Sequence, residues 1–429
     1  MNNSSSQNDA SLPQVRVKRP ERSQIQWREA ALDQLIPKDH RVRAVWAYVD
    51  SLDLKPLYRE IRAVEGSVGR DAVDPKILMA LWMFAIIEGI SSARQLARLC
   101  ERDLAYMWIC GEVGVNYHLL ADFRTAHGEF LDELLTDTIT TLMYQQIVTL
   151  ETVAQDGVRV RANAGSSSFR RKKTLEEYRL EAAEQVKKLK EENTDDASNA
   201  RRRAAAERAA KERAQRVEEA LKNLAELQEQ KEQRQTGSGE EARCSTTDPE
   251  ARNMKMADCG FRPAYNVQFA TDGDARMIVS VDVTNNGSDG GQMAPMQETV
   301  CKRYGKVPKN YTVDGGFATN EDITQVEKSG SQVAAPMTHA DRISKRGGDP
   351  HARRVGDSDE MAAFRERMTT DKAKAILKQR PSIAEFPNAE CRNRGLYQFR
   401  VRGQNKVRTV SLWYAIVFNF MRMMSLGVI

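Results

Sequence analysis

The chain has 429 residues, of which 41% are hydrophobic and 29% are charged, enough for a sizeable buried core and, by length, two or three domains. Its 65 Lys and Arg residues barely exceed its 60 Asp and Glu residues, so the net charge of +5 does not mark a nucleic-acid binder, and any basic surface must be local. The 6 cysteines form no CxxC pair and have no histidine at ligand spacing, which argues against a zinc site.

The first 150 residues divide into a polar leader and a helical region. Residues 1–25 lack the apolar stretch of a signal peptide, and we expect them to be a disordered leader. Residues 26–150 carry apolar side chains three and four positions apart, which predicts an all-α N-terminal domain. Asp74 and Asn116 mark helix starts, and Gly111 marks a helix end.

Two segments of this domain, SSARQLARLC (91–100) and NYHLLADFR (116–124), resemble the helices of a helix-turn-helix module. In that interpretation Arg94, Arg98 and Arg124 contact DNA phosphates. The alternative is that these arginines only solvate a helix face, and the sequence leaves both interpretations open.

The stretch TVAQDGVRVRANAG (152–165) places Asp156 within strand-forming residues. A lone ionised carboxylate costs on the order of several kcal/mol to bury, so its presence in a strand needs a reason. One interpretation is a β-hairpin, because Asp-Gly is a strong turn signal. The other is that Asp156 ends the first strand of a core domain, within the segment 151–169.

Residues 170–245 change character abruptly. They are rich in Lys, Arg, Glu and Ala, and from 170 to 235 they contain neither Pro nor Gly. The spacing of the few apolar residues predicts an antiparallel helical hairpin, inserted after the first core strand. We expect this insertion to be a solvated spacer or a dimerisation arm.

Residues 246–429 alternate between strand and helix patterns, which is typical of an α/β core. The segment 264–284 predicts a β-hairpin that turns at Asp272 and Gly273. The segment YTVDGG predicts a strand that ends at Asp314.

The apolar run 410–427 near the C-terminus is interrupted by Asn419 and Arg422. This interruption favours a buried core helix over a membrane span, so we expect no membrane partner.

The two Asp-Gly steps, at Asp156 and Asp314, suggest a shared site. Adjacent strands of an α/β sheet present their carboxyl ends at one edge, and neighbouring carboxylates stay ionised when a divalent cation such as Mg²⁺ lies between them. A third acid would complete a two-metal site for phosphodiester chemistry, and Glu385 is the candidate because Arg380 and Arg392 flank it.

The rival for the third acid is Glu390. Around these two glutamates, from residue 378 to residue 408, basic residues outnumber acidic ones. Clustered Lys and Arg supply sequence-independent affinity for DNA, although the segment YQFRVRGQNKVRTV could instead be an edge strand with a solvated face. The predicted DNA contacts here are Arg380, Arg392, Arg394, Arg400, Arg402 and Lys406.

Several segments between residues 30 and 425 together carry a resemblance to a known family. They are PKILMALWMFAIIEGISSARQLARLCERDLAYMWICG with HLLADFR, then VAQDGVRVRANA, FRPAYNVQFATD, TVDGGF, and QFRVRGQNKV followed by NFMRM. In this order they resemble bacterial insertion-sequence transposases of the DDE class, which have an RNase H-like catalytic core.

The resemblance implies that Asp156, Asp314 and Glu385 are the acidic triad, with Arg380 and Arg392 as the basic residues around the glutamate. It implies two Mg²⁺ ions, for which Mn²⁺ can substitute, and phosphodiester hydrolysis at element ends followed by strand transfer. The implied partners are double-stranded DNA, at the ends and at the target, and further copies of the chain in a homodimer or larger assembly. The implied location is the bacterial cytoplasm, at the nucleoid.

The chain departs from the family at three positions. Leu377 stands where tyrosine is frequent, Asn388 where an aromatic residue is frequent, and Arg392 where lysine is frequent. Two alternatives therefore stay open: a DNA-binding or dimerising protein with a decayed catalytic core, and an RNase H-like nuclease without strand transfer.

Overall fold

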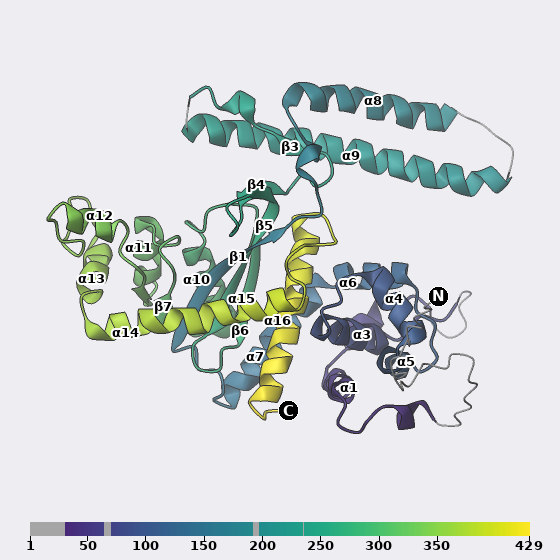
Figure 1. The fold of residues 1–429 in the computed structure, drawn as a ribbon, viewed down its shortest axis with the longest axis horizontal. Coiled ribbons are helices and arrows are strands. Elements are labelled where there is room, and N and C mark those ends of the chain that lie inside the picture. The colour runs from purple at the N-terminus through teal and green to yellow at the C-terminus, as the bar shows by residue number, and fades with distance from the viewer. Residues whose placement is uncertain (1–30, 64–69, 192–196, 235) are drawn as a thin grey trace, which may run out of the picture.

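The computed structural model describes residues 31–63, 70–191, 197–234 and 236–429. It combines a helical N-terminal region with a mixed sheet covered by helices, and a long helical hairpin projects from one end of the sheet (Figure 1). The leader predicted for residues 1–25 lies outside the described residues. Within the described part, no helix is both long and apolar enough to cross a membrane.

The N-terminal region begins its helices where the sequence predicted. The side chain of Asp74 caps one helix and that of Asn116 another, and Gly111 ends a third with a left-handed φ of 53°. Helix α5 separates α4 from α6, so these two are not the consecutive helices of a helix-turn-helix pair that the sequence suggested. The elements are η1 (Leu32–Leu35), α1 (Arg41–Ser51), α2 (Lys55–Arg59), α3 (Pro75–Ile87), α4 (Ala93–Arg102), α5 (Leu104–Cys110), α6 (Tyr117–Ala126) and α7 (Gly128–Tyr144).

The main sheet has the strand order β4-β5-β1-β7-β8, with β6 also paired to β5. Strand β1 runs antiparallel to β5 and parallel to β7. The predicted hairpin of 264–284 is confirmed as β5 and β6. The strands are β1 (Thr152–Arg161), β4 (Arg252–Lys255), β5 (Phe261–Asp272), β6 (Ile278–Thr284), β7 (Asn310–Thr312) and β8 (Gln332–Ala334).

Strand β1 continues through Asp156 and Gly157 as far as Arg161. It stays paired with β5 throughout, with Asp156 opposite Phe269. Both sequence interpretations of the Asp-Gly step are therefore wrong, because Asp156 is neither in a hairpin turn nor at a strand end.

The helical hairpin consists of α8 (Lys172–Glu191) and α9 (Ala197–Arg234), which pack along each other and project from the top of the sheet in Figure 1. Its base has a small core of its own, which includes Leu175, Leu224 and Cys244. Short elements join it to the sheet: η2 (Ser166–Ser168), β2 (Phe169–Arg170), η3 (Gly239–Glu241) and β3 (Cys244–Ser245).

Helices cover both faces of the main sheet. Helices α10 and α11 lie on one side, and the run from α14 to α16 crosses the other (Figure 1). Helix α14, a π-helical turn (η4) and α15 form one continuous helical run. The elements are α10 (Met293–Tyr304), α11 (Asn320–Lys328), α12 (Ala340–Lys345), α13 (Asp359–Arg367), α14 (Asp371–Arg380), η4 (Pro381–Glu385), α15 (Phe386–Asn393) and α16 (Gln404–Ser425).

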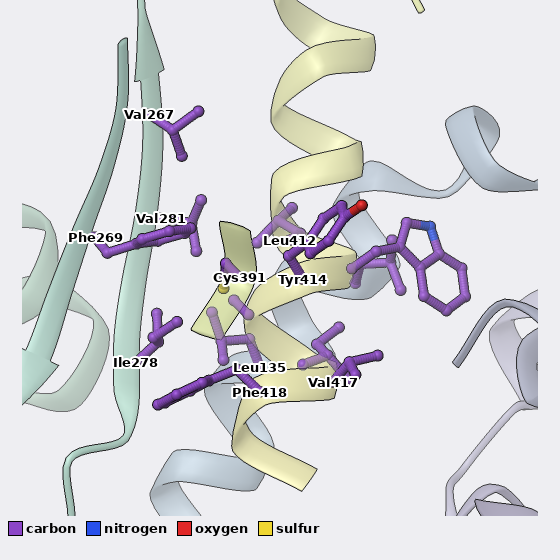
Figure 2. Packing of buried hydrophobic residues seen from close by; sticks show 14 of the residues in the cluster. Leu135, Val267, Phe269, Ile278, Val281, Cys391, Leu412, Tyr414, Val417 and Phe418 are labelled. Atoms are coloured by element: carbon purple, nitrogen blue, oxygen red, sulfur yellow. The ribbon is translucent and has the colours of Figure 1, made fainter. Parts of the chain in front are cut away.

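Helix α16 is the centre of the core, as its apolar sequence predicted. Its side chains, among them Leu412 and Phe418, lie beside Phe269 and Val281 of the sheet and Leu135 of α7 (Figure 2). The same core therefore joins the N-terminal helices to the sheet. The predicted edge strand between residues 397 and 408 is wrong, because α16 begins within that segment.

Candidate active site

The two predicted aspartates lie side by side at the edge of the parallel strands. Ala154 of β1 pairs with Thr312 at the end of β7. Asp156 and Asp314 each follow two residues later, so they occupy equivalent positions on neighbouring segments. The sheet thus brings together residues that are far apart in the sequence, although β1 itself does not end there.

Asp156 is half-buried, on the sheet face that α15 covers. Its carboxylate accepts hydrogen bonds from the amide of Gly157 (2.9 Å, to Oδ1) and from Nδ2 of Asn388 (2.9 Å, to Oδ2). The pKa of Asp156 is raised to about 6, chiefly by burial and to a smaller extent by the charge of Asp314, while the charge of Arg380 opposes the rise. Asp156 is therefore a carboxylate that would gain from a neighbouring positive charge.

Gly157 is required by close packing rather than by a turn. A Cβ at this position would lie 2.5 Å from Oδ1 of Asp289 and 2.5 Å from Nε2 of Gln268. Asp289 accepts hydrogen bonds from Asn266 (2.7 Å), Gln268 (3.0 Å) and Arg159 (3.2 Å). The loop composition around Asp289 gives no sign that its side chain lies behind β1 among these donors.

Glu385 lies on the helical run that crosses this edge. It is the last residue of the π-helical turn between α14 and α15. Its Oε1 accepts a hydrogen bond from Nη2 of Arg380 at 3.0 Å, and its side chain is 58% exposed. The rival Glu390 instead pairs with Arg394 at 3.0 Å.

An open cleft of about 610 Å³ joins the strand edge to this helix. Its lining includes Asp156, Glu385 and Arg392, whereas Glu390 is not part of it, which favours Glu385 as the third acid. Arg159 and Lys255 also line the cleft and were missed by the sequence interpretation. No sequence motif marks either residue as a DNA contact, because Arg159 lies within β1 and Lys255 is the last residue of β4.

Most of the predicted DNA-contacting side chains are exposed. On α4 the exposed residues are Arg94 and Arg98. Near the C-terminus they are Arg392 of α15, Arg400 and Arg402 before α16, and Lys406 in the first turn of α16.

Three of the predicted DNA contacts are engaged inside the protein, and one of them is Arg380, whose side chain is only 13% exposed and pairs with Glu385 at 3.0 Å. The other two are Arg124 and Arg394. Arg124 is only 6% exposed, donates to the carbonyl of Ser91 (2.6 Å) and lies over the ring of Trp82. Arg394 is half-buried and ties α15 to α3 through the carbonyl of Ile87 (3.0 Å) while pairing with Glu390. Both guanidinium groups hold the helical region together, so they are not free for phosphates.

The residues at the strand edge fit a divalent cation chemically, because Mg²⁺ and Mn²⁺ prefer carboxylate oxygens and Asp156 and Asp314 repel each other without one. Across the described residues, however, no three His, Cys, Asp or Glu side chains already form a cluster suited to a metal. The carboxylate of Glu385 is instead paired with Arg380. A three-acid site would require Glu385 to leave Arg380.

Comparison with known proteins gives two matches. Residues 30–126 match a family model described as a transposase domain, and residues 240–420 match one described as a transposase DDE domain. The second match includes Asp314 and Glu385, while strand β1 and the hairpin α8–α9 lie between the two. No curated protein and no solved structure matches the chain.

Proposed function

Because the chain belongs to the DDE transposases of insertion sequences, we propose that it cuts DNA at the ends of a mobile element and joins the freed 3′-hydroxyl ends to target DNA. In this proposal Asp156, Asp314 and Glu385 are the catalytic acids. Two observations carry it: Asp156 on β1 and Asp314 just beyond β7 each follow a paired strand residue by two positions, and Asp156 and Glu385 line one cleft.

The acids would hold two Mg²⁺ ions, or Mn²⁺ in their place. Such ions supply Lewis-acid activation of the attacking oxygen and stabilisation of the leaving oxygen. Asp156 and Asp314 form the fixed part of this set, because the sheet positions both. Glu385 is the adjustable part, since an exposed side chain paired with one arginine can rotate toward the strand edge.

Basic residues around the cleft would hold the DNA backbone. Lys255 and Arg392 line the cleft itself, where their charges can bind the phosphates on either side of the bond to be cut. Arg159 also lines the cleft, but it is paired with Asp289. The exposed residues Arg402 and Lys406 extend this positive surface beyond the cleft. Double-stranded DNA is thus the proposed substrate, and we propose that a homodimer or larger assembly holds two ends together.

Cleavage of DNA that carries the ends of the element tests the proposal, with the matched variants Glu385→Gln and Glu390→Gln. Both remove one negative charge from the same helical run, but only Glu385 lines the cleft. We expect Mg²⁺-dependent cleavage by the wild type, a loss of roughly 100-fold or more in Glu385→Gln, and near-normal cleavage in Glu390→Gln. Equal activity of the wild type and Glu385→Gln would refute the assignment.

A second function, DNA binding without catalysis, is favoured by one observation. Glu385 pairs with Arg380 and no three-acid cluster is formed among the residues that the structure describes. A wild-type protein that binds element ends but never cuts them with Mg²⁺ or Mn²⁺ would establish this function. A protein that cuts but yields no joined product would be a nuclease without strand transfer.

A further inference from the structure

Asn388 makes a direct side-chain contact between the helix of the third acid and the strand of the first. Its Nδ2 donates a hydrogen bond of 2.9 Å to Oδ2 of Asp156, across 232 positions of sequence. The side chain is only 8% exposed and lines the same cleft as Glu385. This contact involves an amide side chain and is separate from the metal binding proposed for the three carboxylates.

We propose that Asn388 is a positioning residue of the metal site: it orients the carboxylate of Asp156 and sets the distance between β1 and the helix that carries Glu385. This inference rests on the proposed function, because it concerns the same acids. It gives a role to a polar residue at a position where the sequence resemblance leads one to expect an aromatic side chain.

The chemistry of the pair fixes the orientation of the amide. An ionised carboxylate can only accept hydrogen bonds, so the NH₂ group of Asn388 must face Asp156. The other end of the amide, Oδ1, is buried and has no hydrogen-bond partner within the described protein. A buried acceptor of this kind calls for a water molecule or a ligand, and an apolar side chain would avoid the problem altogether. Packing alone therefore does not explain an asparagine here.

The position of Asn388 on its helix also supports a role at the proposed metal site. Glu385, Asn388 and Arg392 stand three and four positions apart, which puts them on one helix face, and all three line the cleft. The hydrogen bond to Asp156 is the polar link between this face and β1. Its loss would let the Asp156 carboxylate rotate and the helix move relative to the strand edge.

Second-layer partners that orient a ligand typically change metal affinity by about 10-fold to 100-fold when they are removed. We therefore expect Asn388→Leu, which keeps the branching and the number of side-chain heavy atoms but loses the donor, to weaken Mn²⁺ binding at least about 10-fold. Asn393→Leu is the matched control, because Asn393 is exposed at the end of the same helix. It should bind Mn²⁺ like the wild type.

The measurement is the Mn²⁺ dissociation constant of the full chain without DNA, by titration calorimetry, together with the melting temperature of each variant. Mn²⁺ affinity in Asn388→Leu within twofold of the wild type would overturn the proposal. If that variant fails to fold, Asn388→Asp replaces it. This variant sets a second carboxylate against Asp156, so Mn²⁺ should raise its melting temperature more than that of the wild type, and an equal or smaller rise would overturn the inference.

The variant Asp156→Asn distinguishes a failure of the proposed acidic metal site from a failure of the positioning role of Asn388. If the wild type binds no Mn²⁺, or Asp156→Asn binds it equally well, the proposed acidic site fails and the role of Asn388 fails with it. If Asp156→Asn abolishes binding while Asn388→Leu preserves it, the acidic site stands and only the positioning role is overturned.

Discussion

Asp156→Asn should stabilise the metal-free protein at neutral pH, although it removes a proposed catalytic residue. The pKa of Asp156 is raised from 3.8 to about 6 in the folded chain, first by burial and then by the charge of Asp314. The folded state therefore holds this proton more tightly than the unfolded state, and the free energy of unfolding falls as the pH rises from about 4 to about 6. Above pH 6 the full cost of the buried charge remains.

The size of this cost follows from the pKa. Each pKa unit corresponds to about 1.4 kcal/mol, so the ionised Asp156 costs the folded state up to about 3 kcal/mol at pH 7.5. Asparagine has nearly the same shape and no charge, and its single carbonyl oxygen can still accept the hydrogen bond from Asn388, although its NH₂ group then faces the amide of Gly157 and that hydrogen bond is lost. We expect a net gain of about 1 to 2 kcal/mol, because the lost hydrogen bond offsets about 1 kcal/mol of the charge cost that is removed.

Denaturant unfolding of EDTA-treated wild type and Asp156→Asn at pH 4, 6 and 7.5 measures this difference. The two proteins should be nearly equally stable at pH 4, and the variant should be more stable at pH 7.5. Adding Mn²⁺ should stabilise the wild type and leave the variant unchanged. A variant that is as stable as the wild type, or less stable, at pH 7.5 would refute the electrostatic argument.

Three further changes test other parts of the account. Gly157→Ala should destabilise the chain by about 1 to 3 kcal/mol in a denaturant titration, because its Cβ would lie 2.5 Å from two polar side chains, and an unchanged stability would contradict this packing. Arg380→Ala removes the charge that lowers the pKa of Asp156, so the acid limb of the pH–rate profile should move to higher pH; an unmoved limb would show that Arg380 does not act on Asp156. The double change Arg402→Ala and Lys406→Ala should reduce the slope of log affinity for DNA against log salt by about 0.9 for each phosphate that is no longer neutralised, and an unaltered slope would remove both residues from the DNA surface.

The sequence predicted most of the fold where local signals are strong. Helix caps at Asp74 and Asn116 and the hairpin of β5 and β6 could be predicted because capping and turn chemistry act over a few residues. The course of β1 could not, because Asp-Gly is a turn signal only when nothing packs against the glycine. In this chain Asp289, more than 100 residues later, packs against Gly157, and β1 stays paired with β5 at this position.

The sequence could indicate residue types at the proposed site, but it could not indicate their contacts. Asp156 and Asp314 were predicted because each precedes a glycine after strand-forming residues. The hydrogen bond from Asn388 to Asp156 was not predicted, since a buried amide beside a carboxylate has no local sequence signal. The predicted phosphate contact of Arg124 was wrong for the same reason: only tertiary packing shows that its guanidinium lies over Trp82 instead of in solvent.

Whether Asp156, Asp314 and Glu385 share divalent cations can be measured by anomalous diffraction from a crystal of the chain soaked with Mn²⁺. We expect an ion at roughly 2.0 to 2.2 Å from carboxylate oxygens of both Asp156 and Asp314, with Glu385 turned away from Arg380 toward the same edge. Mn²⁺ bound elsewhere, with the two aspartates bare and Glu385 still paired to Arg380, would contradict it.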